Sequence, residues 1–317
     1  MKLIVTIPAL NEEENIADVI REIPRVITGV DQVEVLVVDD GSTDRTVEIA
    51  KAAGADSLIR HKTNLGLAKT FRDGLDEALK RGADIIVNTD GDNHYDQSKI
   101  PDLVQPILEQ RADIVLGSRK VKELAEMPAI NKYGNLFGSW VNRKLFGFPP
   151  VDLSTGYRAY SREAALRVNV FSNHTYVHTT LLSAIDQKLT IVDIPIRARK
   201  VTRKSRLIKS IPKHILHAQA YIVINIVLFR PIRFFGMLAA LFITVGFLVV
   251  LRFLYLYFTE GGQGHVQSLL LAGVLIIIGF QSIVLGLIAS AIGWSRKLQE
   301  EQLYRLRKRE FDPLSKA

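Results

Sequence analysis

Two long apolar runs in the C-terminal third of the chain constrain its fold most strongly. Residues 234–258 carry no charge except Arg252, and residues 268–294 carry none. Each run exceeds the roughly 20 residues that a helix needs to cross a hydrocarbon core of about 30 Å. We therefore predict a hairpin of two membrane-spanning helices. A pair of fully buried soluble helices is the alternative, but a globular core seldom needs two such runs.

Lysine and arginine flank the hairpin on one side only. Arg230 and Arg233 precede it, six basic residues follow it between 296 and 309, and the connecting loop 259–267 carries none. The positive-inside rule then places both chain ends and the N-terminal region in the cytoplasm, with the chain crossing the cell membrane twice. The absence of cysteine fits that reducing compartment. Leu3–Ile7 is too short for a signal sequence and is typical of a first strand.

A basic block precedes the hairpin. Residues 194–259 contain no Asp or Glu, although the net charge of the whole chain is only +8. Such a block can bind nucleic acid, anionic lipid or a phosphorylated ligand, or can simply anchor the topology. Its position beside the membrane, and the lack of aromatic residues between Arg197 and Lys213, argue against nucleic acid. The apolar stripe within 210–229 is typical of amphipathic helices lying in the membrane interface.

The N-terminal two thirds alternate strand-like and helical patterns. This alternation predicts an α/β fold with a mostly parallel sheet and helices on both faces. The expected strands are Leu3–Ile7, Val33–Val38, Ile85–Asn88, Ile114–Gly117 and Thr190–Ile194, and the expected helices include Glu13–Ile23, Thr43–Ala53 and Leu67–Lys80.

Two carboxylates follow the strand expected at Ile85–Asn88. Asp90 and Asp92 flank Gly91 at the carboxyl end of that strand, where ligands bind in open α/β sheets. Paired carboxylates suit a divalent cation that takes its remaining ligands from water and a diphosphate. Taken alone, the same pattern is also common in turns and helix caps.

The first two strands end in polar residues as well. Asp39, Asp40 and Ser42 can accept hydrogen bonds from a base N–H and a ribose hydroxyl. Asn11 is either a ligand residue or a helix N-cap, with Glu14 completing a capping box.

Six motifs in this order resemble those of family 2 glycosyltransferases with the GT-A fold. They are Pro8-x-x-Asn11-Glu12, Val38-Asp39-Asp40-Gly41-Ser42, Asn64-x-Gly66-Leu67, Asp90-Gly91-Asp92, Gly117-Ser118-Arg119 and Ser154-x-Gly156-Tyr157-Arg158. The resemblance is greatest to the dolichol- and polyprenyl-phosphate sugar synthases. It covers about residues 1–230, and the hairpin is like that of the two-helix members.

The resemblance implies a role for individual positions. Pro8, Leu10, Glu12, Val38 and Asp40 match the residues that hold the base and ribose of a nucleotide sugar. Asp90, Gly91 and Asp92 match the segment that binds a metal, Mg²⁺ or Mn²⁺, and the diphosphate, with Asp92 and Arg119 as the catalytic pair. Lys200 and Arg206 match two further basic positions. Lys200 replaces an arginine, Arg206 a lysine, and Leu10 a frequent tyrosine; lysine and arginine are not equivalent toward phosphate.

The chemistry implied is the inverting transfer of one hexose from GDP-mannose or UDP-glucose to dolichyl or undecaprenyl phosphate. A phosphate monoester is mostly dianionic at neutral pH, so it needs no general base to attack the anomeric carbon. We expect Arg119, Arg158 and the Lys200–Arg206 segment to offset the repulsion between the two anions. His94 is then an outer residue, and His174 and His178 lack the pattern of a metal site.

Two other functions remain as alternatives. A processive polysaccharide synthase of the same fold would carry a Gln-x-x-Arg-Trp motif, which is absent. A non-catalytic membrane-anchored binding protein would not need the acidic pair. The sequence leaves open the base, the sugar, the lipid, the metal and homo-oligomer formation. The expected division is a catalytic domain at 1–207, amphipathic helices at 208–233, the hairpin at 234–294 and a basic cytoplasmic tail at 295–317.

Overall fold

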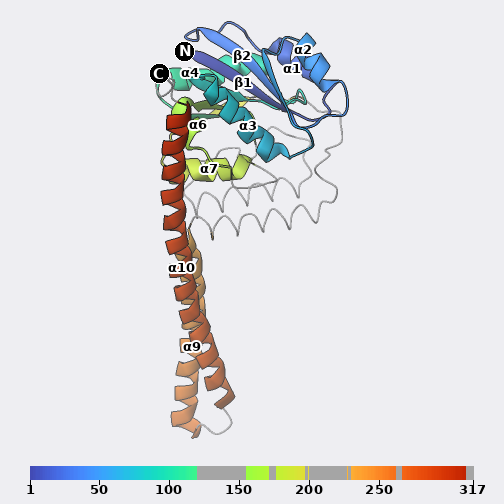
Figure 1. Ribbon diagram of the computed structural model, residues 1–317. Helices are drawn as coiled ribbons and strands as arrows, with labels where there is room; N and C mark the ends of the chain where they lie inside the picture. The colour runs from blue at the N-terminus through green and yellow to red at the C-terminus, as the bar shows by residue number, and fades with distance from the viewer. Residues whose placement is uncertain are drawn as a thin grey trace. The chain divides into compact units, whose positions relative to one another are not determined.

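A computed structural model describes residues 1–119, 155–170, 176–196, 199, 227, 230–261 and 266–311. The chain divides into two compact units. The first comprises Met1–Leu207 together with Glu300–Ala317, and the second comprises Ile208–Gln299. The first unit is built on a β-sheet, and the second contains two long helices (Figure 1).

The sheet of the first unit has the strand order β3-β2-β1-β4-β6-β5-β7. Strand β6 is antiparallel to both of its neighbours, and the other pairs are parallel. The mostly parallel sheet predicted from the sequence is therefore confirmed. The strands are β1 (Lys2–Ala9), β2 (Gln32–Asp39), β3 (Ser57–Arg60), β4 (Ile85–Asn88), β5 (Ile114–Arg119), β6 (Arg158–Ser161) and β7 (Ile191–Ile196).

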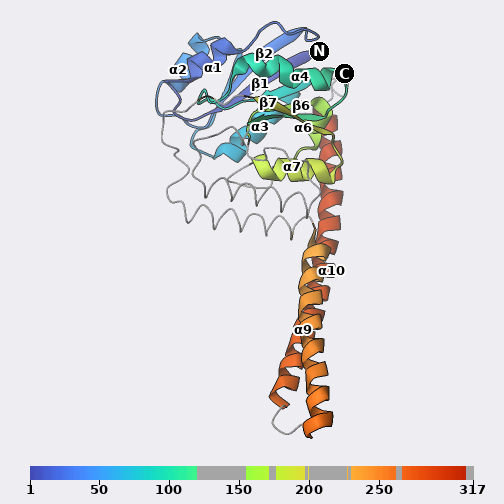
Figure 2. The same cartoon turned by 180° about the vertical axis from the view of Figure 1, so that it is seen from behind.

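Helices cover both faces of this sheet, as expected (Figures 1 and 2). Side chains that alternate along β1 enter two separate cores, since Val5 packs with helices on one face and Ile4 with helices on the other. Burial on both faces explains why the central strands read as continuous apolar runs. One face carries α1 (Ile16–Glu22), α2 (Thr46–Ala52) and α4 (Ile100–Leu108) after the short 3-10 helix Gln97–Lys99, and the other carries α3 (Leu67–Lys80), α6 (Arg162–Arg167) and α7 (Val177–Asp186).

The loops before α1 and α2 are longer than the sequence suggested, because their polar residues bond to each other. Asn11 has a positive φ of 54° and does not cap a helix; Asn15 occupies the N-cap of α1. The Asn11 side chain accepts a hydrogen bond from the backbone N–H of Thr43 at 2.9 Å, and the Asn11 N–H donates to Ser42 Oγ at 2.9 Å. The capping-box interpretation of Asn11 is wrong, and the residue ties the first two strand ends together.

The second unit contains most of the two apolar helices, α9 (Pro231–Glu260) and α10 (Val266–Phe311), which are long and apolar enough to cross a membrane. Small residues let them pack closely, since a Cβ built on Gly246 would lie 3.2 Å from the carbonyl oxygen of Ala272. Large apolar side chains face outward along both helices; Phe258 is 81% exposed and Trp294 68%. Such a surface requires an apolar environment.

The last turns of α10 belong to the first unit. Arg307 is only 8% exposed. Its guanidinium donates to the carbonyls of Leu166 at 3.3 Å and Val168 at 3.1 Å and pairs with Asp76 of α3. Arg307, one of the six basic residues that follow the hairpin, is therefore a packed residue of the first unit.

Candidate functional site

The carboxyl ends of β1, β2 and β4 form the edge of the sheet where the site is expected. The chain places β2 on one side of β1 and β4 on the other, so β1 lies at a topological switch point, the usual place for a ligand in such sheets. The β1–β2 ladder sets Pro8 beside Val38 and Ala9 beside Asp39. Asp40 continues the alignment, donating its N–H to the Ala9 carbonyl at 2.9 Å. The residues expected to hold the base and ribose are thus brought together.

The loop after β1 lies against the acidic segment after β4. A Cβ built on Gly91 would lie 3.3 Å from the Pro8 carbonyl oxygen and 3.6 Å from Glu12 Cγ. The Glu12 N–H donates to Thr46 Oγ1 at 2.8 Å, and its carbonyl accepts from the first turn of α1. Leu10, between these fixed points, is half-buried. The predicted nucleotide and metal segments are therefore neighbours.

Asp90 lies against Gly156, which comes from the segment before β6. A Cβ on Gly156 would approach Asp90 Oδ2 to 3.0 Å and Tyr176 Oη to 2.9 Å, so any larger residue would displace one of these side chains. Two hydrogen bonds hold this backbone in place: Asn88 Nδ2 donates to the Gly156 carbonyl at 2.9 Å, and the Gly156 N–H donates to Tyr95 Oη at 3.1 Å. The glycine of the Ser-x-Gly-Tyr-Arg motif thus shapes the wall beside Asp90.

Tyr176 is fully buried behind Asp90. Burial, and then the negative charge of Asp90, raise the pKa of its hydroxyl well above the usual range. The hydroxyl therefore stays protonated; it accepts from Asn88 Nδ2 at 2.9 Å. A neutral hydroxyl adds no second negative charge next to the carboxylate.

Asp92 stands in a tight turn after Gly91. Its Oδ1 accepts from the His94 N–H at 3.1 Å, and Asn93 between them has a positive φ of 58°. Within the ranges that the structure covers, no group of three or more His, Cys, Asp or Glu side chains gathers. Two carboxylates without a third protein ligand fit Mg²⁺ or Mn²⁺ only where a substrate diphosphate completes the coordination.

Arg199 forms hydrogen bonds with the turn that contains Asp92. Its guanidinium forms an ion pair with Glu22 at the end of α1 and donates to Asn93 Oδ1 at 2.5 Å. The Arg199 N–H donates to the His94 carbonyl at 2.8 Å. The hydrogen bond to Glu22 is the main reason that the pKa of Arg199 is raised. Lys200, expected to meet the diphosphate, follows directly in the chain but lies outside the described residues.

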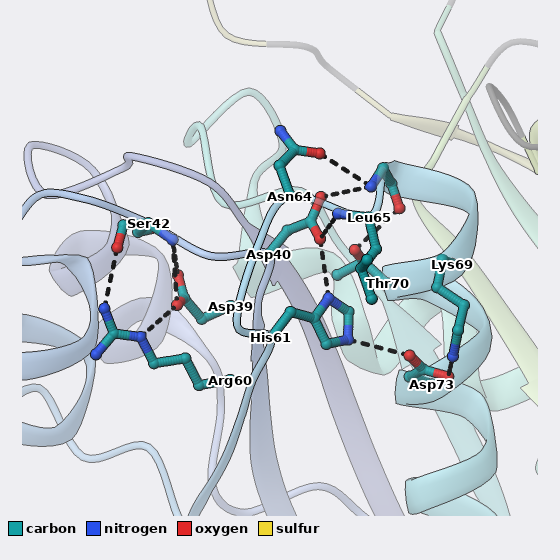
Figure 3. A network of polar contacts seen from close by, with 11 residues as sticks. Asp39, Asp40, Ser42, Arg60, His61, Asn64, Leu65, Lys69, Thr70 and Asp73 are labelled. Atoms are coloured by element: carbon teal, nitrogen blue, oxygen red, sulfur yellow. Dashed lines mark hydrogen bonds and ion pairs between the residues drawn. The ribbon is translucent and has the colours of Figure 1, made fainter.

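The two carboxylates at the carboxyl end of β2, Asp39 and Asp40, have different partners (Figure 3). Asp39 is fully buried, accepts from the Ser42 N–H at 3.2 Å and pairs with Arg60 Nε at 3.3 Å. Asp40, 4% exposed, accepts from the Leu65 and Gly66 N–H groups at 2.8 and 2.9 Å. His61 Nδ1 lies 2.8 Å from Asp40 Oδ1. Asp40 thereby holds the loop that opens α3.

The basic residues expected to contact the reacting anions differ in where the structure places them. Arg119 ends β5, whose carboxyl end lies at the same edge of the sheet as that of β4; only its backbone is described. Arg206 lies outside the described residues. The expectation that Arg158 meets the reacting anions is wrong, because its side chain is fully buried and donates to the Thr155 carbonyl at 2.8 Å and Thr180 Oγ1 at 3.0 Å.

Three residues at the site were not identified from the sequence. His61 follows β3, and its place at the strand's carboxyl end would have drawn attention had that short strand been predicted. Tyr176 and Arg199 meet segments more than 80 residues earlier in the chain, Asn88 and Glu22 respectively. No local pattern connects such partners.

Comparisons with known proteins identify the family of the chain. Residues 4–168 match the family model described as glycosyl transferase family 2. The chain is 32% identical over 213 residues to the UDP-N-acetylglucosamine–dolichyl-phosphate N-acetylglucosaminyltransferase of Methanococcus voltae, covering 60% of this chain and 83% of the relative. It is 30% identical over 205 residues to the dolichyl-phosphate hexose transferase of Haloferax volcanii, covering 65% and 86%.

A solved structure shares the fold. Glucosyl-3-phosphoglycerate synthase of Mycobacterium tuberculosis, in complex with Mn²⁺, UDP and phosphoglyceric acid, aligns with a TM-score of 0.51 and 25% identity over 70% of this chain and 78% of that one. The family match spans more than half of the chain and includes the strand ends that build the site. The chain belongs to family 2 of the glycosyl transferases.

Proposed function

We propose that this protein transfers one hexose from a nucleotide sugar to a polyisoprenyl phosphate, with inversion at the anomeric carbon. Two relatives named as dolichyl-phosphate sugar transferases, each covered over more than four fifths of its length, support a lipid phosphate as acceptor. The apolar helices α9 and α10 support a reaction at a membrane surface, where such an acceptor is found.

The observation that carries the proposal is the position of the acidic pair. Asp90 and Asp92 follow β4 at the switch point of the sheet, beside the Pro8–Glu12 loop and one strand away from Asp40. A nucleotide seated over the ends of β1 and β2 would direct its diphosphate toward this pair. Bound there, Mg²⁺ or Mn²⁺ would neutralise the charge of the departing nucleoside diphosphate.

The residues of the chain have three tasks in this reaction. Pro8, Leu10, Glu12, Val38 and Asp40 hold the nucleoside; Asp90, Gly91 and Asp92 hold the diphosphate side. Arg119, Lys200 and Arg206 bring the anionic acceptor toward the anomeric carbon by offsetting its repulsion from the donor. The acceptor oxygen already carries negative charge, so attack in line with the departing diphosphate needs no general base and inverts the centre.

We further propose that the first unit and both chain ends lie on the cytoplasmic side. The one-sided distribution of lysine and arginine around the apolar runs supports this orientation. Residues 1–207 would form the catalytic domain, 208–233 would lie in the interface, 234–294 would span the membrane twice, and 295–317 would return to the cytoplasm.

A panel of donors tests the proposal. Membranes containing the protein are incubated with radiolabelled GDP-mannose, UDP-glucose or UDP-N-acetylglucosamine and either polyprenyl phosphate or polyprenol, and the lipid is extracted. We expect label in the lipid with one donor class and only with the phosphorylated acceptor. Label in a high-molecular-weight polymer, or none in lipid with any donor, would contradict it.

A further inference from the structure

The carboxylate of Asp40 is almost fully engaged by the protein (Figure 3). Its Oδ1 accepts from the Leu65 N–H at 2.8 Å and lies 2.8 Å from His61 Nδ1. Its Oδ2 accepts from the Gly66 N–H at 2.9 Å. Gly66 has a φ of 91° and precedes the first turn of α3, so both N–H groups are held by backbone geometry rather than by mobile side chains.

His61 donates to Asp40 rather than accepting from it. The second ring nitrogen, Nε2, lies 3.0 Å from Asp73 Oδ2, and Asp73 also pairs with Lys69. Ionised carboxylates accept hydrogen bonds only, whereas a neutral imidazole carries one donor and one acceptor nitrogen. Because an ionised carboxylate accepts hydrogen bonds only, His61 Nδ1 is the donor in the contact with Asp40 Oδ1.

One acceptor position of the Asp40 carboxylate remains available for a ligand. A carboxylate offers about four lone-pair positions, two on each oxygen. Among the described residues, Leu65 and His61 occupy both positions of Oδ1, and Gly66 occupies one position of Oδ2. Asp40 is 4% exposed, so it is not fully enclosed by the protein. The carboxylate can therefore accept one more N–H, at Oδ2.

We infer that Asp40 selects a uridine sugar donor over a guanosine one. This inference rests on the proposed function, in which Asp40 meets the base of the nucleotide. Uracil presents one N–H, at N3, between two carbonyl oxygens. Guanine presents two adjacent donors, N1–H and the 2-amino group, and a carboxylate takes both only when each oxygen has a free position. With Oδ1 filled, one guanine donor would lose its partner.

An unpaired donor in a closed site is costly, which is why sites built around hydrogen bonds discriminate strongly. Guanine can reach this site only by giving up one of its hydrogen bonds or by displacing His61 or the Leu65 N–H. His61 is held on its far side by Asp73, and the Leu65 N–H belongs to the loop that opens α3. His61 cannot move away without losing its contact with Asp73, and the Leu65 N–H cannot move away without shifting the loop that precedes α3.

Binding of UDP and GDP to the full-length protein tests the inference directly. The protein is purified in detergent with Mn²⁺, and both dissociation constants are measured by calorimetry. We expect UDP to bind at least about tenfold more tightly than GDP. Equal binding, or tighter binding of GDP, would overturn the inference and leave the proposed function standing. Binding of neither nucleotide would overturn both.

A variant of His61 tests whether its contact with Asp40 Oδ1 sets the nucleotide preference. His61→Leu removes one donor from Oδ1, so we expect the preference for UDP over GDP to shrink at least about threefold. If His61 had a purely structural role, the variant would bind UDP and GDP more weakly by the same factor. An unchanged ratio of the two dissociation constants would contradict the inference. Asp73→Asn is the matched control: it keeps an oxygen beside Nε2 of His61, leaves the donors of Asp40 in place and should preserve the ratio.

Discussion

The carboxylate of Asp90 lies against the backbone of Gly156, so closely that a Cβ on this glycine would lie 3.0 Å from Oδ2 and 3.1 Å from Oδ1. Asp90 follows β4 and Gly156 precedes β6. These two strands pair in antiparallel fashion, with Asn88 opposite Arg158. A side chain at position 156 would therefore crowd the acidic residue that is proposed to hold the donor diphosphate.

Gly156→Ala should displace the Asp90 carboxylate. We predict that transfer falls at least about tenfold, equivalent to about 1.4 kcal/mol. Overpacking against Tyr176 should also cost about 1–3 kcal/mol of stability. Transfer rates and thermal unfolding midpoints measure the two effects. Gly273→Ala is the control, because no heavy atom lies within 4 Å of its added Cβ. Full activity of the Gly156 variant would contradict the proposed role of Asp90.

Arg307→Ala should destabilise the first unit. The change removes the donors from the Leu166 and Val168 carbonyls and leaves Asp76 without this ion pair. We predict a loss of about 1–3 kcal/mol, the cost of leaving buried polar groups unpaired. Thermal unfolding of the solubilised protein measures it. Arg305→Ala on the same helix, a 74% exposed side chain paired with Glu301, should change stability by less than about 0.5 kcal/mol. Equal effects would show that Arg307 does not dock α10.

Cysteine labelling tests the membrane orientation. The natural chain has no cysteine, so single cysteines at Gly262 and Ser315 report without background. We predict that an impermeant maleimide labels the two from opposite faces of the membrane, with Ser315 cytoplasmic, because lysine and arginine flank the hairpin on one side only. Labelling of both from one face would mean that the chain does not cross twice.

Alanine variants in the basic block before the hairpin distinguish specific ligand contacts from a general electrostatic attraction to the membrane. If Lys200 and Arg206 contact the donor diphosphate, Ala at either position should weaken donor binding or transfer at least about tenfold, or about 1.4 kcal/mol. Ala at Lys209 or Lys213 should reduce membrane affinity by about 1 kcal/mol and leave transfer nearly unchanged. Small and equal effects at all four positions would contradict the proposed contacts of Lys200 and Arg206 with the donor diphosphate.

The sequence predicted the central strands and both apolar helices because their burial dictates their composition. Strands β1, β2 and β4 are buried on both faces and read as apolar runs. Strands β3 and β6 were missed for opposite reasons. Strand β3 is short, and none of its residues is fully buried at the sheet edge. Strand β6 begins with Arg158, an arginine buried by hydrogen bonds rather than by an apolar character that a pattern can show.

The strand ends that carry the site were predictable, but the contacts that shape it were not. Asp40 and Asp90 stand out because polar residues follow apolar strands. The donors that fill Asp40 come from a separate loop, and Arg199 reaches Glu22 and Asn93 from far along the chain. Such contacts depend on how distant segments fold together, so the role expected for Arg158 was wrong and that of His61 was overlooked.

The dependence of sugar transfer on Asp92 and on a divalent metal can be measured with the purified full-length protein. The assay follows radiolabelled hexose from its nucleotide into extracted polyprenyl phosphate for the wild type and for Asp92→Asn, which keeps the size of the side chain but removes its charge. We predict label in lipid for the wild type with Mg²⁺ or Mn²⁺, and none with excess EDTA or in the folded, membrane-bound variant. Undiminished labelling by Asp92→Asn, or by the wild type in EDTA, would contradict it.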